Sequence, residues 1–332
     1  MSNYIYIYQG NAKDKMNLFA DFDKLDNVKC LPTKRKQVKN KILKYLQDVY
    51  LSYTIAKTIR LPFKYFMYDL SEIEINDNDN YTIIMVSNVF FDFDISIIKK
   101  ISKKKNVKLA LILLDSLDVN SPSAKLIRKI YKYSMWNYIF TYDLNDAEKY
   151  GFMYLNEHYY SVPQIKEDTN ILYDAYFFGA LKQGRKQKII ELFKKLKNNN
   201  VNARFDIVKN NQHNFNYKDE NFFVYEKKQK YIDGLKNTMH ANCIIELLQE
   251  NQKAQSLRYF EAVVFNKKLL TSNENIKKLS FYDKRYMKVF KNLEDIDFDW
   301  VNKKEEIDYN YKNEFSPIYI IEELEKIQKS EF

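Results

Sequence analysis

Short, uninterrupted apolar runs alternate with amphipathic stretches along the first half of the chain. Apolar residues spaced three and four positions apart predict a helix, whereas a short continuous run predicts a strand that is buried on both faces. Continuous apolar strands with helices between them indicate a parallel sheet covered on both sides. The predicted elements are the strands 4–8, 81–87, 107–115 and 136–143, and the helices 33–59, 94–104 and 121–134.

The second half repeats this rhythm after a polar stretch, 161–172, that is predicted to link the two halves. The sequence therefore predicts the α/β class, with two Rossmann-like doubly wound domains facing each other across a cleft, the first over residues 1–165. The predicted elements of the second half are the strands 174–180, 201–208, 221–226, 243–248 and 267–271, and the helices 184–200, 231–239 and 254–265.

The composition suits two packed cores and excludes several classes of protein. The chain has 332 residues, 45% of them hydrophobic, but no run of about 18 apolar residues that would span a bilayer. The N-terminal stretch alternates isoleucine and tyrosine, which predicts a strand and not a signal peptide. Cys30 and Cys243 stand far apart in no metal-like spacing, so we expect no disulfide framework, no zinc site, and a reducing, cytoplasmic compartment.

The formal net charge of +10 raises two alternatives, a nucleic-acid-binding α/β protein and contact with an anionic membrane. The abundance of Lys, Asn, Ile, Tyr and Phe is typical of an AT-rich genome, which accounts for part of the lysine excess. No basic stripe with interleaved aromatic residues marks a nucleic-acid-binding module. The clusters Lys34-Arg35-Lys36 and Lys103-Lys104-Lys105 are either solvated helix faces or contacts with an anionic membrane.

Rare glycines and an arginine follow the first predicted strand of the second half. Gly179 and Gly184 flank its end, and Arg185 lies in the first turn of the next predicted helix. Ligands of an open parallel sheet bind at the carboxyl ends of its strands, and helix N-termini attract anions, so these residues predict a phosphate site. The alternative is an ordinary turn with a solvated arginine.

The stretch QSLRYFEAVVFNKKLLT, residues 255–271, places an arginine and a glutamate on one face of a predicted helix. Ser256 is a candidate N-cap, followed by Leu257 and Arg258, and Glu261 comes three positions after the arginine. In one interpretation Arg258 and Glu261 form only a weak ion pair. In the other, Arg258 holds a diphosphate with a bidentate geometry that lysine cannot provide, and Glu261 accepts hydrogen bonds from ribose hydroxyls.

Residues 243–290 read CIIELLQENQKAQSLRYFEAVVFNKKLLTSNENIKKLSFYDKRYMKVF. This segment resembles the donor-binding part of bacterial GT-B glycosyltransferases of capsule and lipopolysaccharide biosynthesis, with their pattern D-I-L-E … Q-x-G-x-S-L-R-x-x-E-A-L … K-K-L-I-T-x-N. Ala254-Gln255 departs from the glycine of the pattern, and Cys243 stands where many members have aspartate. The matching positions are Glu246, Gln252, Ser256, Leu257, Arg258, Glu261, Ala262 and Thr271.

The resemblance touches both halves of the chain. Residues 173–185 resemble the family's first donor-domain strand, and residues 137–155 resemble the end of its acceptor domain. Residues 316–327 resemble the C-terminal segment that returns to the first domain. The likeness implies a nucleotide-sugar-binding domain over residues 166–315 and a crossing helix over residues 316–332.

The resemblance also implies a reaction, the transfer of a hexose-type sugar from a nucleotide sugar to a growing surface glycan. The acceptor would be a glycan or a lipid-linked glycan, and the place the cytoplasm or the inner face of the membrane. Arg258, Arg185 and helix N-termini would stabilise the leaving nucleoside diphosphate without a metal or other cofactor. The spacing Asp-x-Asp occurs at Asp297-Phe298-Asp299, in a charged, loop-like stretch. Whether the reaction inverts or retains stays open, because the two-glutamate motif of many retaining members is not cleanly present.

An inverting transfer needs a base for the acceptor hydroxyl. The candidates are His158, near the predicted linker, and Asp115 and Asp143, which each end a predicted strand of the first half. His240 precedes the strand that leads to the Arg258 helix and is placed with the donor-binding residues. Helix capping is the alternative role for both aspartates, and a structural role for both histidines. A nucleotide- or sugar-binding protein without catalysis is the remaining alternative.

Overall fold

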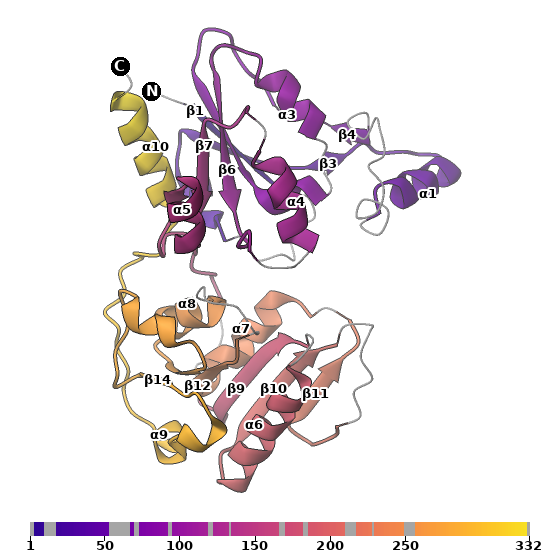
Figure 1. Ribbon diagram of the computed structural model, residues 1–332. Helices are drawn as coiled ribbons and strands as arrows, with labels where there is room; N and C mark the ends of the chain where they lie inside the picture. Colours follow the sequence, from indigo (N-terminus) through magenta and orange to yellow (C-terminus); the bar gives the residue numbers. More distant parts are fainter. Residues whose placement is uncertain are drawn as a thin grey trace. The chain divides into compact units, whose positions relative to one another are not determined.

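The chain folds into two compact α/β units (Figure 1). The first unit runs to Ser161 and takes in the chain from Phe315 onward, and the second holds Val162–Glu314. The computed structural model describes residues 3–9, 18–52, 67–69, 73–91, 95–118, 122–132, 134–165, 170–181, 185–209, 217–227, 229–248 and 256–330.

The sheet of the first unit has the order β2-β1-β5-β6-β7-β8, and all its strands are parallel. The four strands predicted for this half are confirmed; β1 begins one residue earlier than predicted, and the other three are shorter than predicted. Two further strands at the sheet edges, β2 and β8, were not predicted because they are short and partly exposed. The strands are β1 (Asn3–Tyr8), β2 (Val28–Pro32), β5 (Tyr81–Val86), β6 (Val107–Leu113), β7 (Tyr138–Thr141) and β8 (Met153–Tyr154).

Helices cover both faces of this sheet. Ile98 of α3 (Ile95–Ile101) and Ile127 of α4 (Pro122–Ile130) belong to the same apolar cluster as Ile83 of β5. Successive strand residues point to opposite faces, and Thr82 accepts a hydrogen bond of 2.8 Å from Gln328 of α10 (Ile318–Ser330). The C-terminal helix therefore packs on the face opposite α3 and α4. The unit also contains α5 (Leu144–Tyr150) and the 3₁₀ helices η2 (Ala20–Lys24) and η4 (Ser87–Phe91).

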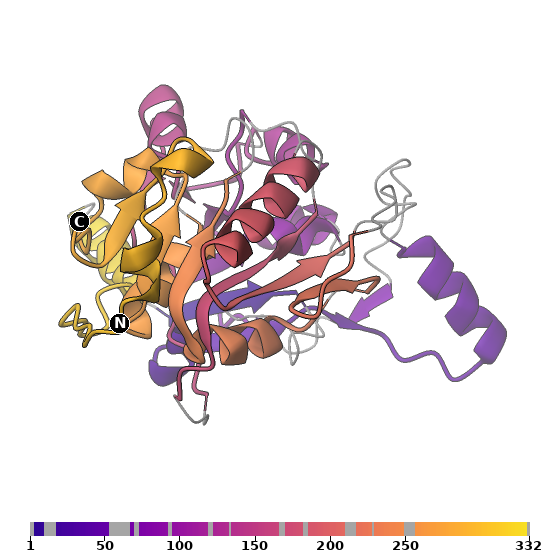
Figure 2. The ribbon, with the colours of Figure 1, turned by 90° about the horizontal axis from the view of Figure 1, so that it is seen from below.

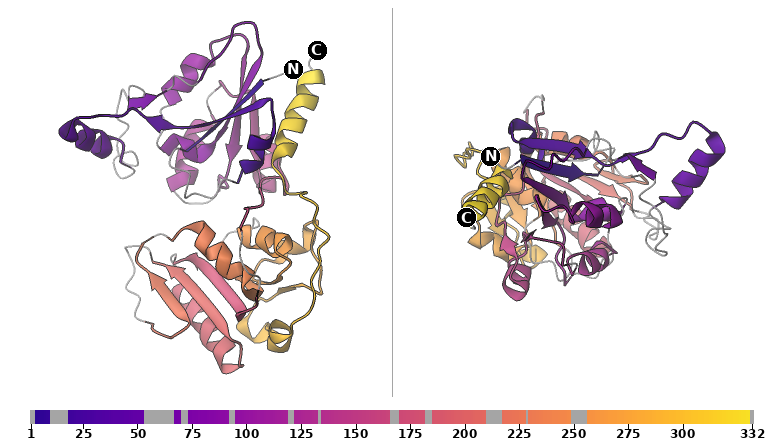
Figure 3. Two further views of the ribbon diagram at one scale, coloured as in Figure 1. Left: turned by 180° about the vertical axis from the view of Figure 1, so that it is seen from behind. Right: turned by 90° about the horizontal axis from the view of Figure 1, so that it is seen from above.

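The predicted helix 33–59 is wrong over its first part. Lys34–Arg35 forms β3, which pairs antiparallel with β4 (Tyr68–Asp69), and the helix α1 is limited to Lys41–Tyr50. Asn40 sets its start, since the side-chain oxygen accepts hydrogen bonds from the backbone N–H groups of the second and third helical residues. The remainder of the prediction, residues 53–59, lies outside the described residues. Within its unit, α1 stands apart from the six-stranded sheet (Figures 2 and 3).

The sheet of the second unit has the order β11-β10-β9-β12-β13-β14, again entirely parallel. In chain order this is the 3-2-1-4-5-6 arrangement of a Rossmann-type doubly wound sheet. The predicted α/β class with two Rossmann-like units is confirmed. The strands are β9 (Tyr173–Ala180), β10 (Ala203–Val208), β11 (Phe222–Tyr225), β12 (Ala241–Glu246), β13 (Lys268–Thr271) and β14 (Met287–Val289).

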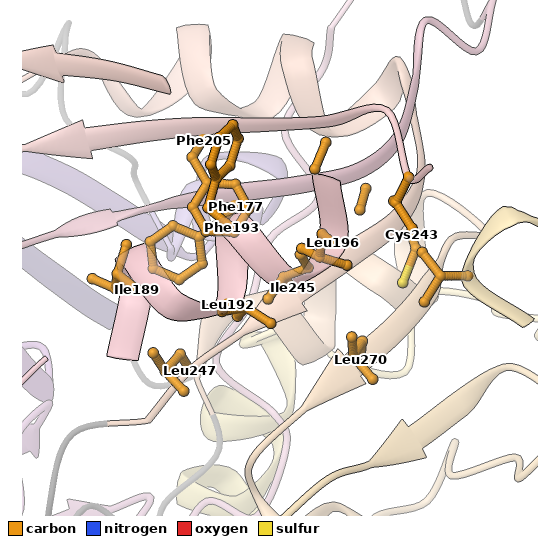
Figure 4. Packing of buried hydrophobic residues seen from close by; sticks show 14 of the residues in the cluster. Phe177, Ile189, Leu192, Phe193, Leu196, Phe205, Cys243, Ile245, Leu247 and Leu270 are labelled. Atoms are coloured by element: carbon orange, nitrogen blue, oxygen red, sulfur yellow. The ribbon is translucent and has the colours of Figure 1, made fainter. Parts of the chain in front are cut away.

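The alternation of side chains decides which helix covers which face of this second sheet. Phe177, Phe205 and Ile245 point to one face and form an apolar cluster with α6 (Lys186–Asn198), as Figure 4 shows. Phe178 points to the opposite face, which α7 (Tyr231–Met239) covers. Gly234 of α7 lies against the Phe178 ring, and a side chain at this position would overlap the ring. The unit also contains α8 (Leu257–Val264), α9 (Phe298–Asn302), η5 (Glu274–Lys278) and η6 (Leu293–Asp295).

Candidate functional site

The second sheet offers a ligand-binding edge where its strand order reverses. β9 and β12 are neighbours there, with β10 and β13 on either side. In open parallel sheets, ligands bind beyond the carboxyl ends of the strands at such a switch point. These ends are Ala180 for β9 and Glu246 for β12. The side chains around them define the candidate site.

Arg185 connects the two strand ends. It was predicted in the first turn of the helix but is the N-cap residue of α6, and its Nη2 donates a hydrogen bond to the carbonyl oxygen of Leu247. Its guanidinium lies 5.7 Å from the centre of the Phe177 ring. Burial lowers the pKa of Arg185, and the negative charge of Glu246 opposes this shift. Its Nε is buried without a hydrogen-bond partner among the described residues, so this side chain retains a donor for a ligand.

Gly179 leaves room for the contact between Arg185 and Phe177. A Cβ atom at this position would lie 3.0 Å from Cζ of Phe177 and 3.8 Å from Nη2 of Arg185. A side chain here would therefore push against the ring on which the guanidinium rests. The second predicted glycine, Gly184, lies outside the described residues.

The Arg258–Glu261 pair lies at the amino end of α8 and is buried. Ser256 caps the helix by accepting a hydrogen bond of 3.2 Å from the backbone N–H of Arg258. Nη1 of Arg258 lies 2.6 Å from Oε2 of Glu261, and their side chains are only 11% and 0% exposed. The arrangement is therefore not the solvated surface pair that the spacing alone allows. Leu257, the first helical residue, is partly buried.

Two aromatic rings hold this pair in place. The guanidinium carbon of Arg258 lies 5.6 Å from the ring centre of Phe178 on β9 and 5.9 Å from that of Tyr231, the first residue of α7. The Tyr231 hydroxyl also donates a hydrogen bond to Oε1 of Glu261. The sheet and two helices thus fix the arginine and the glutamate together.

Burial raises the pKa of Glu261 to about 7, well above the ordinary value of 4.5 for this side chain. The positive charge of Arg258 and the hydrogen bond from Tyr231 lower it, and the nearby Glu246 raises it further. A carboxyl group whose pKa is near 7 changes its charge within the physiological pH range. The charge of Glu261 therefore depends on the cations and hydroxyl groups beside it.

Glu246 adds a second buried carboxyl group at the end of β12. It is paired in register with Thr271 of β13, whose hydroxyl donates a hydrogen bond to Oε2. Burial raises the pKa of Glu246, while Ser256, Thr271 and Arg258 lower it. Two residues beyond Thr271, the buried Asn273 caps η5 with its oxygen, and its Nδ2 has no hydrogen-bond partner among the described residues.

His240 is not brought to this edge. It is the C-cap residue of α7 and comes directly before β12, so it lies at the amino end of the strand whose carboxyl end carries Glu246. At about 3.3 Å per residue the two ends of β12 are about 17 Å apart. Its Nδ1 lies 2.9 Å from the carbonyl oxygen of Asn170. The prediction of His240 as a donor-binding residue is thus corrected to a position near the opposite edge of the sheet.

The candidate bases of the first unit occupy separate local settings. Asp143 caps α5, because its Oδ1 accepts hydrogen bonds of 2.9 and 3.3 Å from the N–H groups of Asn145 and Asp146. Asp115 follows β6, the neighbouring strand, and is partly buried. His158 stacks on Tyr319 of α10, with ring centres 4.1 Å apart. Asp115 and Asp143 follow adjacent parallel strands and thus lie at the same edge of the sheet.

The described residues contain no group of three or more His, Cys, Asp or Glu side chains that could hold a metal ion. Asp297, the first residue of Asp297-Phe298-Asp299, caps α9, and its carboxylate lies 2.6 Å from Nζ of Lys288. Gln252, matched to the pattern of donor-binding residues, lies outside the described residues.

The sequence interpretation missed two residues of this edge. Asn273 corresponds to the final asparagine of the T-x-N pattern, so that pattern could have identified it. Tyr231 could not have been found, since it is one of 28 tyrosines and stands 30 positions before the glutamate that it contacts.

The sequence matches no protein-family model, and no curated protein matches it significantly. Solved structures do resemble it. T4 phage BGT in complex with UDP and Mn²⁺ has a TM-score of 0.50 at 15% identity, over 91% of this chain and 89% of that one. A mutant of S. aureus TarM with fondaparinux, α-GlcNAc-glycerol and UDP has a TM-score of 0.48 at 12% identity. That match covers 79% of this chain and only 57% of TarM. The likeness to BGT bears on the fold, which is two Rossmann-like units of the GT-B type.

Proposed function

We propose that this chain is a glycosyltransferase that moves a sugar from a nucleotide-sugar donor to a hydroxyl group of a bacterial surface-glycan acceptor. The observation that carries the proposal is the burial of Arg258 with Glu261 at the switch point of the second sheet, beside Glu246. Burying an arginine and two carboxyl groups costs desolvation energy that an apolar cluster would avoid. A binding site for a charged, hydroxyl-rich ligand gives this cost a function. The GT-B fold shared with a UDP-bound structure supports this interpretation.

The residues of the edge have complementary tasks in this proposal. Arg258 and Nε of Arg185 face the diphosphate. Charged donors such as these bind a diphosphate more strongly than neutral donors do. Glu261 accepts hydrogen bonds from the ribose hydroxyls. The unpaired Nδ2 of Asn273 donates to an oxygen of the donor. The amino end of α8 adds backbone N–H groups that favour negative charge.

In the proposed reaction the bond between the sugar C1 and the phosphate oxygen breaks, and its electron pair leaves with the nucleoside diphosphate. The acceptor oxygen forms a new bond to C1 and releases its proton to a base. Fixed cations beside the leaving group stabilise the charge that develops on it, so the reaction needs no metal in this proposal. Asp115 and Asp143, which follow adjacent strands of the first unit, are the first bases to test, and His158, which stacks on Tyr319, is the third.

Two further features belong to the proposal. The acceptor is a glycan or a lipid-linked glycan, and nucleic acid is not a partner. The protein acts in the cytoplasm or at the inner face of the membrane, in keeping with Cys30 and Cys243, which are both free thiols.

The test is titration calorimetry with UDP and other nucleoside diphosphates, followed by detection of nucleotide release from the matching nucleotide sugars. Wild-type protein should bind one of the diphosphates and gain about 2.7 kcal/mol of stability at a hundredfold excess over its dissociation constant. Arg258→Ala should abolish binding. The matched control is Arg285→Ala, since Arg285 also forms a close ion pair, with Asp283, but its side chain is 67% exposed.

Loss of the Arg258 side chain leaves Glu261 without its ion-pair partner, so the variant is measured near pH 6, where the carboxyl group holds its proton. The double variant Arg258→Met with Glu261→Gln serves as a second, uncharged version of the site. Equal diphosphate binding by wild type and Arg258→Ala would contradict the proposed site. Diphosphate binding without any sugar transfer or donor hydrolysis would instead identify a non-catalytic binding protein.

A further inference from the structure

The helix α1 presents its apolar face to solvent. Successive helical positions rotate by about 100°, which places every apolar side chain of Lys41–Tyr50 on one side and Lys41, Lys44, Gln47 and Asp48 on the other. Apart from Tyr50, which packs against the apolar cluster of the first unit, the apolar side is not buried against the residues that the structure describes. Its exposed members, here called the α1 face, are Ile42 (72%), Leu43 (55%), Tyr45 (68%), Leu46 (54%) and Val49 (37%).

The polar side of α1 is the side that is fixed to the protein. Gln47 is buried, and its Nε2 donates hydrogen bonds to the carbonyl oxygens of Lys36 and Met67, which belong to the β3–β4 ribbon and its flanks. Asp48 forms a hydrogen-bonded ion pair of 3.3 Å with Arg35 of β3. The contacts thus hold α1 with its apolar residues outward, the reverse of a helix that completes a core.

Basic side chains surround the α1 face. Residues 35–50 carry a single acidic side chain, Asp48, and a net charge of +4. The basic residues are all exposed, and they are Arg35, Lys36, Lys39, Lys41 and Lys44. An outward apolar stripe with lysines along its border is the pattern of a helix that lies in the surface of an anionic bilayer. No described helix has the length and apolarity to cross a bilayer.

We propose that the α1 face docks on an anionic lipid bilayer, with Ile42, Leu46 and Val49 entering the boundary between headgroups and acyl chains. Lysine side chains reach from such a helix to the lipid phosphates. Charge complementarity favours this partner over a second copy of the chain, because pairing two α1 faces would bring two clusters of net charge +4 together. The inference rests on α1 and its ribbon alone and does not depend on the chemistry at the second sheet.

The test is flotation of the full-length protein with vesicles of phosphatidylcholine, with and without phosphatidylglycerol. Wild-type protein should bind the anionic vesicles and bind the neutral ones far less. Lys41→Glu and Lys44→Glu should each weaken the partition by at least about fivefold, the effect expected for one basic residue near the surface. Leu46→Asp should abolish binding, whereas Leu144→Asp, at a 49% exposed leucine of α5, should leave it unchanged.

Two measurements keep the outcomes apart. Diphosphate binding, measured by calorimetry, should be the same in wild type and Leu46→Asp. Loss of vesicle binding by this variant can then be distinguished from loss of the proposed donor site. Sedimentation equilibrium should show no dimer that Leu46→Asp removes. No binding of wild type to anionic vesicles, or equal binding by Leu46→Asp, overturns the proposal. A dimer that is lost in Leu46→Asp overturns it as well, in favour of a second copy on the α1 face.

Discussion

Replacing Glu261 by glutamine should remove a pH dependence from the stability of the second unit. In the folded protein this carboxyl group keeps its proton up to about pH 7, whereas in the unfolded chain it releases the proton near 4.5. Between these values the folded state binds the extra proton, so the free energy of unfolding falls as the pH rises through this window. Glutamine has nearly the same volume and has no proton to lose.

The size of the effect follows from the difference between the two pKa values. From 4.5 to about 7, at 1.36 kcal/mol per unit, the loss amounts to about 3 kcal/mol at most. It is complete only above about pH 7, where Glu261 is charged in both states. Below about pH 7 Arg258 faces a neutral carboxyl group in the folded protein, so the glutamine variant keeps the same charge at this position in that range.

Urea unfolding followed by tryptophan fluorescence measures this effect. The chain has two tryptophans, and a Trp136→Phe background leaves only Trp300, which packs in the core of the second unit. The difference in unfolding free energy between Glu261→Gln and the background protein is then measured from about pH 5 to about pH 8. Glu226→Gln is the control, since Glu226 is 71% exposed. Parallel pH profiles for Glu261→Gln and the background would refute the argument that burial raises the pKa of Glu261.

Two further predictions concern the proposed reaction. Asp115→Asn should lower the transfer rate in steady-state assays by about 10²-fold or more if this residue is the base. Asp143→Asn should keep both the α5 cap and most of the activity. A large loss of activity in Asp143→Asn and not in Asp115→Asn would identify Asp143 as the base. Treatment with EDTA should leave the transfer rate unchanged, because in the proposed reaction Arg185 and Arg258 take the place of a metal beside the leaving group. Loss of activity in EDTA that Mg²⁺ or Mn²⁺ restores would contradict the metal-independent reaction.

The fold was predictable from the sequence wherever burial on both faces produced a continuous apolar strand, as in β6. It was not predictable where a local hydrogen bond overrides periodicity. The apolar spacing of 33–59 runs on through Asn40, yet the side chain of that asparagine ends the preceding extended segment and starts α1. The edge strand β14 has only three residues, which is too short for any alternation to be recognised.

The candidate site was predictable in its residue types and spacing, but not in its burial. The three-residue separation of Arg258 and Glu261 placed them on one helical face, as observed. That they are enclosed depends on Phe178 and Tyr231, which are distant in the sequence. The position of His240 was predicted wrongly, because a residue that is close to a strand in the sequence can lie at either end of that strand.

The return of the chain into the first unit has a consequence for biosynthesis. α10 is joined to that unit by a hydrogen bond of 2.8 Å from Gln328 to Thr82 and one of 3.3 Å from Asn27 to Glu325. On the ribosome the whole second sheet emerges before this helix does, so the part of the protein that is translated first is the last to be completed. A premature stop codon shortly before α10 would thus leave an incomplete first unit attached to a second unit that has all of its strands.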